Sequence, residues 1–339
     1  MRPARIPRAK RPYICENGSE VPNMNDSPFR TVEIIANPTA RNGEAAEAAR
    51  WLRAHAVPAG RLGNAPARIT VVDTAHAGDA CRIARTTAAD VVVGLGGDGI
   101  AHEIAQGLMA RPRDERPAFG LLPFGNGNDY ARTIGMPAND VEAAWRALDG
   151  AIVRPLDVGE CNGTFVLQTA SFGLDAAIAL GTQDRRARTG ITGTRLYLEE
   201  GFDQLAHHLV TRHATIALDE GAPFDFPLIL GAVQIGRTYG GGFDICPTAD
   251  AADGIFDICL AEGPVSPAQA LFVFLRAKHG RHLGNRHITS MRARRVEITF
   301  DQAPPCQVDG ERLEGRRFTL TMHPRELDVL CGREQRASR

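Results

Sequence analysis

The sequence has no apolar run long enough to cross a membrane, no Cys-x-x-Cys pair and almost no lysine. Its longest apolar runs, such as Ala270–Leu275, fall far short of the roughly 18 residues that a membrane span needs. The basic N-terminus is not followed by an apolar segment, so we expect no secretory signal. Seven scattered cysteines in a chain of 339 residues indicate reduced thiols in a cytoplasmic protein, with neither a disulfide framework nor a zinc site.

The composition is that of a globular protein. Hydrophobic residues make up 43% and charged residues 23% of the chain, which excludes wholesale disorder, and the length predicts about two domains. Because the net charge is −1, any affinity for an anionic surface must come from local clustering. Residues 1–28 contain a cluster of basic residues, and we interpret them as a disordered tail. The tail either is simply solvated or forms a weak electrostatic tether to anionic lipid.

Residues 29–150 predict a parallel α/β domain that binds a nucleotide. Short apolar strands alternate here with Ala-rich helical stretches, a pattern typical of a parallel sheet covered on both faces. The expected strands are Thr31–Ala36, Ile69–Val72, Val91–Val93 and Phe119–Leu122, and the expected helices are Glu44–His55, Ala80–Ala89 and Ile100–Met109. Ligands of open α/β sheets bind at the carboxyl ends of the strands.

Residues 151–332 predict a mostly antiparallel β domain, with a last strand that could return to the first domain. Short strand candidates, including Thr164–Ala170, are separated by turns, and two helical stretches interrupt them at Thr194–Leu209 and Pro267–His279.

The strongest chemical signal is the segment from Val91 to Glu103. A buried strand leads into Gly94, Gly96, Gly97 and Gly99 and then into a helix, an arrangement whose backbone N–H groups can bind phosphate. These glycines also satisfy the Gly-x-Gly-x-x-Gly pattern of dinucleotide sites.

Three observations argue against a dinucleotide site. The loop follows the third predicted strand, the region about 20 residues further on is a loop without a ribose-binding acid, and Asp98 lies inside the turn. An acid in a phosphate loop is better explained if it holds Mg²⁺, directly or through water.

Two further loops follow strand ends. Asn37–Gly43 supplies a hydroxyl and a guanidinium, and Pro123–Arg132 supplies glycines and amides, with Asn128 or Asp129 expected to cap the next helix. One such loop could be an ordinary turn, but three at successive strand ends favour a nucleotide cradle.

The motifs Asn37–Gly43, Gly96–Glu103 and Pro123–Arg132 together resemble those of the diacylglycerol kinase catalytic family, which is related to sphingosine and ceramide kinases and shares the NAD-kinase-like fold class. The resemblance spans most of residues 31–330. It implies an ATP- and Mg²⁺-dependent lipid kinase, with ATP in the cleft between an N-terminal parallel α/β domain and a C-terminal antiparallel β-sandwich-like domain. The residues it assigns to ATP are Asn37, Pro38, Thr39, Ala40, Arg41, Thr74, Gly96, Gly97, Asp98, Gly99, Ile100, His102, Glu103, Gly125, Asn126, Asn128 and Asp129.

The resemblance also implies two acidic sites in the second domain. Pro247–Asp257 is similar to a family segment that binds a structural Mg²⁺, which implies Asp253 and the main-chain oxygens of Asp250 and Ile255 as ligands of a site separate from the one expected at Asp98. The alternative is a plain β-turn. Asp309-Gly310-Glu311 resembles the family segment that supplies the general base, and either Asp309 or Glu311 could be that base. The alternative interpretation is that Asp309-Gly310 only forms an exposed hairpin turn.

This chain departs from the family pattern at three positions. Ile100 replaces a threonine, His102 an asparagine and Asn126 a threonine. These changes keep open a catalytically weak nucleotide-binding regulatory protein, and the shared Gly-Gly-Asp-Gly loop keeps open a kinase of a soluble acceptor such as an NAD kinase.

The segment from Pro264 to Val296 contains seven Lys/Arg and no Asp or Glu. Together with the apolar helix before it, this basic run predicts peripheral contact with an anionic membrane, at the inner face if the protein is cytoplasmic. The alternative is a core-facing helix followed by a solvated basic face. Nucleic acid is not expected as a partner because aromatic residues are not interleaved here. The sequence does not indicate an oligomeric state.

Overall fold

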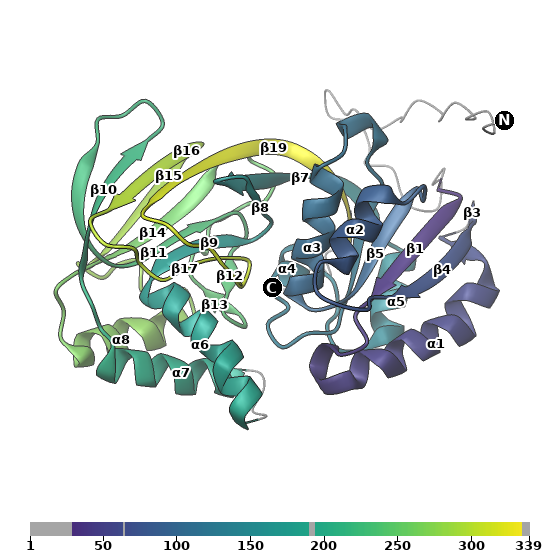
Figure 1. Ribbon diagram of the computed structural model, residues 1–339, viewed down its shortest axis with the longest axis horizontal. Helices are drawn as coiled ribbons and strands as arrows, with labels where there is room; N and C mark the ends of the chain where they lie inside the picture. Colours follow the sequence, from purple (N-terminus) through teal and green to yellow (C-terminus); the bar gives the residue numbers. More distant parts are fainter. Residues whose placement is uncertain (1–28, 64, 190–193, 334–339) are drawn as a thin grey trace.

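The computed structural model describes residues 29–63, 65–189 and 194–333, so the predicted tail at residues 1–28 lies outside the described residues. Two lobes lie side by side, joined by the long strands β7 (Ile152–Cys161) and β19 (Arg317–Cys331) (Figure 1). The fold class predicted from the sequence is confirmed: a parallel α/β domain precedes an antiparallel β-sandwich-like domain.

The N-terminal domain is built on four parallel strands in the order β4, β1, β5, β6. These are β1 (Thr31–Ala36), β4 (Arg68–Asp73), β5 (Val91–Gly96) and β6 (Ala118–Pro123). Every residue of β5 and β6 is buried, because helices cover both faces of the sheet. The helices are α1 (Glu44–Ala59), α2 (Asp79–Thr86), α3 (Asp98–Met109), α4 (Asp129–Thr133) and α5 (Val141–Asp149), with 3-10 turns at Ala40–Gly43 and Arg113–Glu115.

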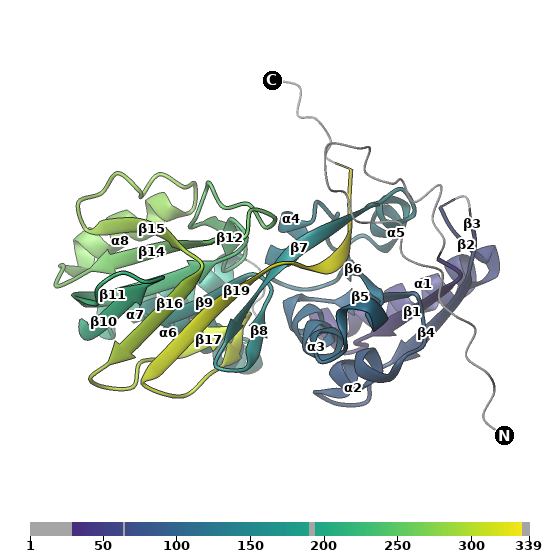
Figure 2. The same cartoon turned by 90° about the horizontal axis from the view of Figure 1, so that it is seen from above.

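Right-handed crossovers place α1 on one face of this sheet and α2 and α3 on the other, as Figure 2 shows. Helices α2 and α3 pack closely because residue 107 has no side chain: a Cβ there would lie 2.3 Å from the carbonyl oxygen of Cys81. This packing fixes the direction of α3, whose first turn carries the Gly-rich motif.

The C-terminal domain continues the same sheet. Strand β19 pairs with β7 along most of its length and meets β6 in parallel at Val329 and Phe119. The order then runs through β16, β10, β11, β9, β17 and β18. Off this path, β14 pairs with β11, β15 pairs with β14, and β8 pairs with β7. The bounds are β8 (Thr164–Val166), β9 (Thr169–Gly173), β10 (Arg212–Leu218), β11 (Phe224–Gln234), β14 (Phe256–Glu262), β15 (Ile288–Ala293), β16 (Arg295–Phe300), β17 (Cys306–Val308) and β18 (Glu311–Arg312). Short strand pairs are β2 (Arg61–Leu62) with β3 (Ala65–Pro66), and β12 (Thr238–Tyr239) with β13 (Phe243–Asp244).

Three helices lie along one side of this domain: α6 (Leu174–Thr189), α7 (Thr194–His207) and α8 (Pro267–Ala277) (Figure 1). The sequence analysis predicted α7 and α8 but missed α6. The single strand expected at Thr164–Ala170 is also wrong, because the chain leaves the sheet at Leu167 and Gln168 between β8 and β9.

Across the residues that the structure describes, no helix is both long and apolar enough to span a membrane.

Candidate active site

A cleft of about 640 Å³ lies between the two domains. One wall is formed by the loops that follow β1, β4, β5 and β6, which is where the carboxyl ends of parallel strands must meet. The other wall is formed by the β8–β9 link, the turn around Asp309, and Tyr239 with Gly240. The cleft therefore faces both domains.

Most of the residues predicted from the sequence line this cleft. They are Asn37, Thr39, Ala40, Arg41, Thr74, Gly97, Asp98, Gly99, Ile100, Glu103, Gly125, Asn126, Asp129, Asp309 and Glu311. Four others lie behind the wall and support it: Pro38, Gly96, His102 and Asn128. Asp250, Asp253 and Ile255 lie elsewhere, in the loop between β13 and β14.

The two Gly-rich loops touch each other through their backbones. A Cβ on Gly125 would lie 2.4 Å from the Cα of Gly97, and one on Gly97 would lie 3.0 Å from the Cα of Gly125. Glycine is required at both positions because no side chain fits between the loops. This close approach brings the N-terminus of α3 and the loop before α4 to one edge of the cleft, where backbone N–H groups can receive phosphate.

Asp98 connects these two loops. Its Oδ1 accepts a hydrogen bond of 3.1 Å from the backbone N–H of Tyr130, in the first turn of α4. Burial, followed by the negative charge of Asp129, raises the pKa of Asp98 to about 7. Asp98 is half-buried, and an acid in such a position beside other acids is unfavourable unless it is protonated or meets a cation.

Asn128 occupies the predicted N-cap position of α4, but its side chain makes no capping hydrogen bond. The carboxylate of Asp98, at the start of α3, accepts from the N–H of Tyr130 in its place. Asn128 instead donates to the carbonyl oxygen of Gly125. The carboxylate of Asp129 accepts from the N–H groups of Gly241 and Gly242, both at 2.8 Å. Asp129 therefore ties α4 to the second domain.

Asp309 occupies a hairpin turn between β17 and β18. Asp309 and Gly310 have φ angles of +50° and +97°, the pair of left-handed residues that a tight hairpin turn favours. The hairpin geometry was one of the alternatives, but Asp309 is buried, with 8% of its surface exposed.

The carboxylate of Asp309 holds four hydrogen bonds. Its Oδ1 accepts from the N–H groups of Gln168 and Thr169, at 2.9 and 3.0 Å. Its Oδ2 accepts from the N–H of Leu167 at 2.8 Å and from Nδ1 of His102 at 3.1 Å. These backbone donors would otherwise belong to a continuous strand, which explains why β8 and β9 are separate.

His102 links the two domains through its bond to Asp309. Burial lowers the pKa of His102, but the hydrogen bond and the charge of Asp309, with those of Glu311 and Glu103, raise it overall. Glu311 lies on the other side of the turn, exposed to the cleft, with its Oε1 4.0 Å from where a Cβ on Gly99 would stand.

The acids around Asp98 fit a divalent cation that also contacts phosphate. Within the described part of the chain, no three acidic, histidine or cysteine side chains form a complete metal site by themselves. Mg²⁺ commonly uses one or two carboxylates and takes its remaining ligands from water and substrate phosphates. Beyond the effect of burial, the negative charges of Asp129 and Asp309 lie close enough to Asp98 to raise its pKa, and such a cation would offset them.

The loop with Asp250, Asp253 and Ile255 is closed by protein groups. The carboxylate of Asp253 accepts from the N–H of Ile255 and pairs with Arg292. The carbonyl oxygen of Asp250 accepts from the N–H of Asp253 at 3.4 Å. The turn is thus a compact β-turn with an ion pair, and a metal in this loop stays a prediction.

Sequence reasoning missed the β8–β9 link and the Tyr239–Gly242 segment. The three consecutive glycines of that segment were a visible signal of a backbone that must approach another group closely. The sequence gives no sign of the break between β8 and β9, because the pattern of Thr164–Ala170 is that of one continuous strand.

Known proteins resemble this chain over nearly its whole described length. The family model of the diacylglycerol kinase catalytic domain matches residues 31–161, and that of the YegS C-terminal NAD kinase beta sandwich-like domain matches residues 168–331. A diacylglycerol kinase of Bacillus subtilis is 28% identical over 257 residues, covering 74% of this chain and 82% of the relative.

A Pseudomonas aeruginosa protein named "Probable lipid kinase YegS-like" is 31% identical over 255 residues, covering 74% of this chain and 81% of the relative. A solved structure of a diacylglycerol kinase from Bacillus anthracis superposes with a TM-score of 0.67 at 21% identity, covering 90% of this chain and 98% of that one. This last likeness concerns the fold.

Proposed function

Because this chain belongs to the diacylglycerol kinase catalytic family, we propose that it transfers the terminal phosphoryl group of ATP to a hydroxyl group of diacylglycerol or a related lipid. The observation that carries the proposal is the cleft, where Gly-rich loops from one domain face an acidic turn from the other. Phosphoryl transfer needs this combination of phosphate binding, charge neutralisation and a positioned base.

The nucleotide phosphates bind along the Gly97 and Gly125 loops. Backbone N–H groups at the N-terminus of α3 stabilise negative charge, and Thr39, Arg41 and Thr74 supply side-chain donors from the neighbouring strand ends. Asp98 would hold Mg²⁺, and the ion would supply positive charge near the phosphates.

Glu311 is the general base in this proposal, and Asp309 positions it. A base needs an accessible lone pair, and both oxygens of Asp309 already accept two hydrogen bonds each. Glu311 is exposed in the cleft two residues further on. It takes the proton as the acceptor oxygen bonds to the γ-phosphorus and the bond to the ADP oxygen breaks.

The test measures transfer of the labelled terminal phosphate of ATP to diacylglycerol in mixed micelles. We expect Glu311→Gln to lower kcat by about 10²- to 10⁴-fold while ATP binding is retained. Glu314→Gln, an exposed glutamate on the far side of the hairpin, is the matched control and should keep the wild-type rate.

Two results would contradict the proposal at different levels. A Glu311→Gln enzyme with full activity would refute the choice of base alone. A wild-type enzyme that phosphorylates a water-soluble acceptor but no component of a total lipid extract would refute the lipid assignment.

A further inference from the structure

Buried polar side chains lie beneath the acidic turn, where α6 packs on β9 and β17. In β17, Gln307 stands between Cys306 and Val308, which both pack in the core of the C-terminal domain. Because side chains alternate along a strand, Gln307 points to the opposite face of the sheet. Its register partner in β9 is Ser171, and both residues are fully buried. The two therefore form a directly opposed cross-strand pair of polar residues.

Gln307 uses both ends of its side-chain amide. Its Oε1 accepts a hydrogen bond from the backbone N–H of Gly310 at 2.6 Å, and its Nε2 donates to the Oγ of Ser171 at 2.7 Å. The side chain thus connects the tip of the hairpin to the adjacent strand. A buried amide without partners is costly, so these two bonds fix the conformation of Gln307 and the position of the turn together.

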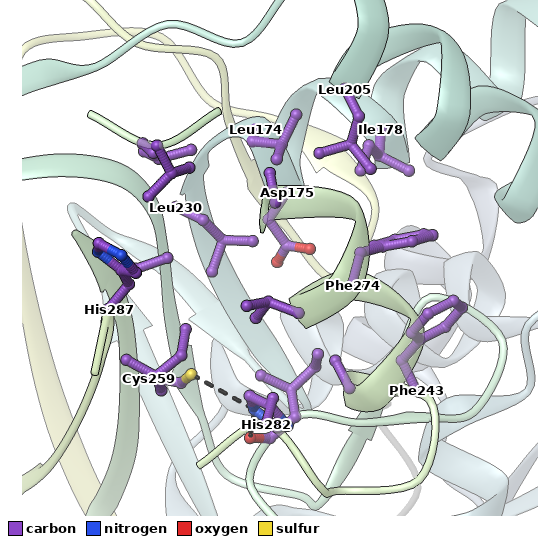
Figure 3. Close-up of a pocket in the computed structure, with 18 of the residues that line it drawn as sticks. Leu174, Asp175, Ile178, Leu205, Leu230, Phe243, Cys259, Phe274, His282 and His287 are labelled. Atoms are coloured by element: carbon purple, nitrogen blue, oxygen red, sulfur yellow. Dashed lines mark hydrogen bonds between the residues drawn. The ribbon is translucent and has the colours of Figure 1, made fainter. Parts of the chain in front are cut away.

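A further hydrogen bond leads from Ser171 to Asp175, in the first turn of α6. Because the Oγ of Ser171 accepts from Gln307, its own proton is free to be donated to Asp175. Burial raises the pKa of Asp175 to about 7, and the hydrogen bond from Ser171 acts in the opposite direction. Figure 3 shows the Asp175 carboxyl group among apolar side chains. We call Gln307, Ser171 and Asp175 the polar row.

The polar row holds the part of the turn that Asp309 does not hold. The carboxylate of Asp309 ties the first residue of the turn to the β8–β9 link. Gln307 holds the second residue, Gly310, and Glu311 follows directly, exposed in the cleft. A shift of the Gly310 peptide would therefore move the Glu311 carboxylate. A displacement of about 1 Å at a reacting group can lower a rate about 100-fold.

We propose that Gln307 is a positioning residue for the base Glu311. Supported by the other two side chains of the polar row, Gln307 holds the N–H of Gly310 and keeps the Glu311 carboxylate at the edge of the cleft. This inference rests on the proposed function, because it concerns the phosphoryl transfer in which Glu311 accepts the proton. It requires no contact between the polar row and either substrate.

The kinetic test makes the same substitution at two fully buried glutamines. Gln307→Met removes the bonds to Ser171 and the turn. Gln234→Met is the matched control, because Gln234 in β11 is equally buried but its amide faces the carbonyl oxygens of Gly236 and Arg237. We expect Gln307→Met to lower kcat about tenfold or more at an unchanged KM for ATP, and Gln234→Met to stay within about threefold of wild type. Equal kcat values in the two variants would overturn the proposal.

A double-mutant cycle tests whether Ser171 acts through Gln307. Ser171→Ala removes the group to which the Gln307 Nε2 donates, so we expect a smaller loss of kcat, about three- to fivefold. If the two side chains act as one support, the double variant should be no slower than Gln307→Met alone. Losses that multiply in the double variant would show that Ser171 does not act through Gln307 and would overturn the polar row.

Amide hydrogen exchange separates this proposal from the kinase assignment, because it needs no substrate. In the full-length protein, Gly310 should exchange about tenfold faster in Gln307→Met than in wild type or Gln234→Met. Circular dichroism checks folding, and Ser171→Ala replaces Gln307→Met in both measurements if that variant does not fold. Unchanged exchange in the folded variant would overturn the proposal even if lipids are phosphorylated. Faster exchange, with no lipid phosphorylated by wild type, would support the polar row and refute the kinase assignment.

Discussion

The cleft between the two domains and a smaller cavity beneath α8 both bury a carboxyl group, but they surround it differently. The cavity has a volume of about 90 Å³ and is lined mainly by apolar side chains, among them Leu174, Ile178 and Phe274 (Figure 3). Asp309 at the cleft accepts four hydrogen bonds, three of them from the backbone, and its position is fixed by the chain itself. Asp175 at the cavity has an oxygen with no protein partner. The difference is that the chain's own donors satisfy Asp309, whereas Asp175 is buried with one carboxyl oxygen that no described protein group satisfies.

The largest contrast should come from the same substitution at both positions. Asp309→Asn turns an amide N–H₂ toward donors that need an acceptor, so we expect the free energy of unfolding to fall by about 3–5 kcal/mol and kcat by at least about 100-fold. Asp175→Asn removes no acceptor that a described protein group uses at Oδ2, so it should retain ATP binding and lower stability much less. Urea unfolding and steady-state kinetics measure both, with Asp114→Asn on the surface as the control. Equal losses of stability and activity in Asp309→Asn and Asp175→Asn would show that the two carboxyl groups do not differ in this way.

The pH dependence of stability should identify Asp175 separately. Burial raises the pKa of Asp175 from 3.8 to about 7, so between these values the folded state holds a proton that the unfolded chain releases. Stability from this group therefore falls as pH rises through that window, by roughly 2–4 kcal/mol. Relative to wild type, Asp175→Asn should become more stable between pH 4 and pH 8 in urea unfolding. A difference independent of pH would mean that Asp175 is ionised in the folded protein.

A smaller pH-dependent effect on stability is expected at His102, where attraction to Asp309, and not burial, raises the pKa. Its pKa is raised in the folded state, so its charged bond to Asp309 is fully present below the unfolded value near 6.5 and is lost as pH rises through the folded value. The asparagine in His102→Asn can still donate a hydrogen bond to Asp309, but it cannot carry a positive charge. The stability advantage of wild type over this variant should be about 1–2 kcal/mol at pH 6 and should vanish at high pH. A constant advantage would contradict the charged pair.

The smallest effect should come from substitution of Lys278, which connects α8 to the loop that contacts Asp129 in the cleft. Lys278, at the end of α8, donates to the carbonyl oxygen of Gly241 at 3.1 Å and lies over the Phe243 ring. Gly241 in turn donates to Asp129 in the cleft. Lys278→Met should raise the KM for ATP about two- to fivefold, by a loss of about 1 kcal/mol or less, and Lys278→Arg should restore most of it. Identical kinetics in all three proteins would show that the contact of Lys278 with Gly241 does not affect ATP binding in the cleft.

Sequence patterns predicted which loops come together on one wall of the cleft. Parallel strands end at one edge, so the Asn37, Gly97 and Gly125 loops had to come together once the alternating pattern was recognised. The acidic turn was found by its motif. The missed elements are those whose local patterns are ambiguous: α6 begins within a run of strand candidates, and the β8–β9 break depends on a partner about 140 residues away.

The order of strands and helices, the glycine positions and the acidic turn are properties of the sequence itself, because periodicity and backbone freedom are local. Only the tertiary structure decided that Asp98 accepts from the N–H of Tyr130, that Asp309 interrupts a strand, and that α8 covers a cavity beside the cleft. Hydrogen bonds and burial between distant segments depend on how the whole chain packs, and no local pattern encodes them.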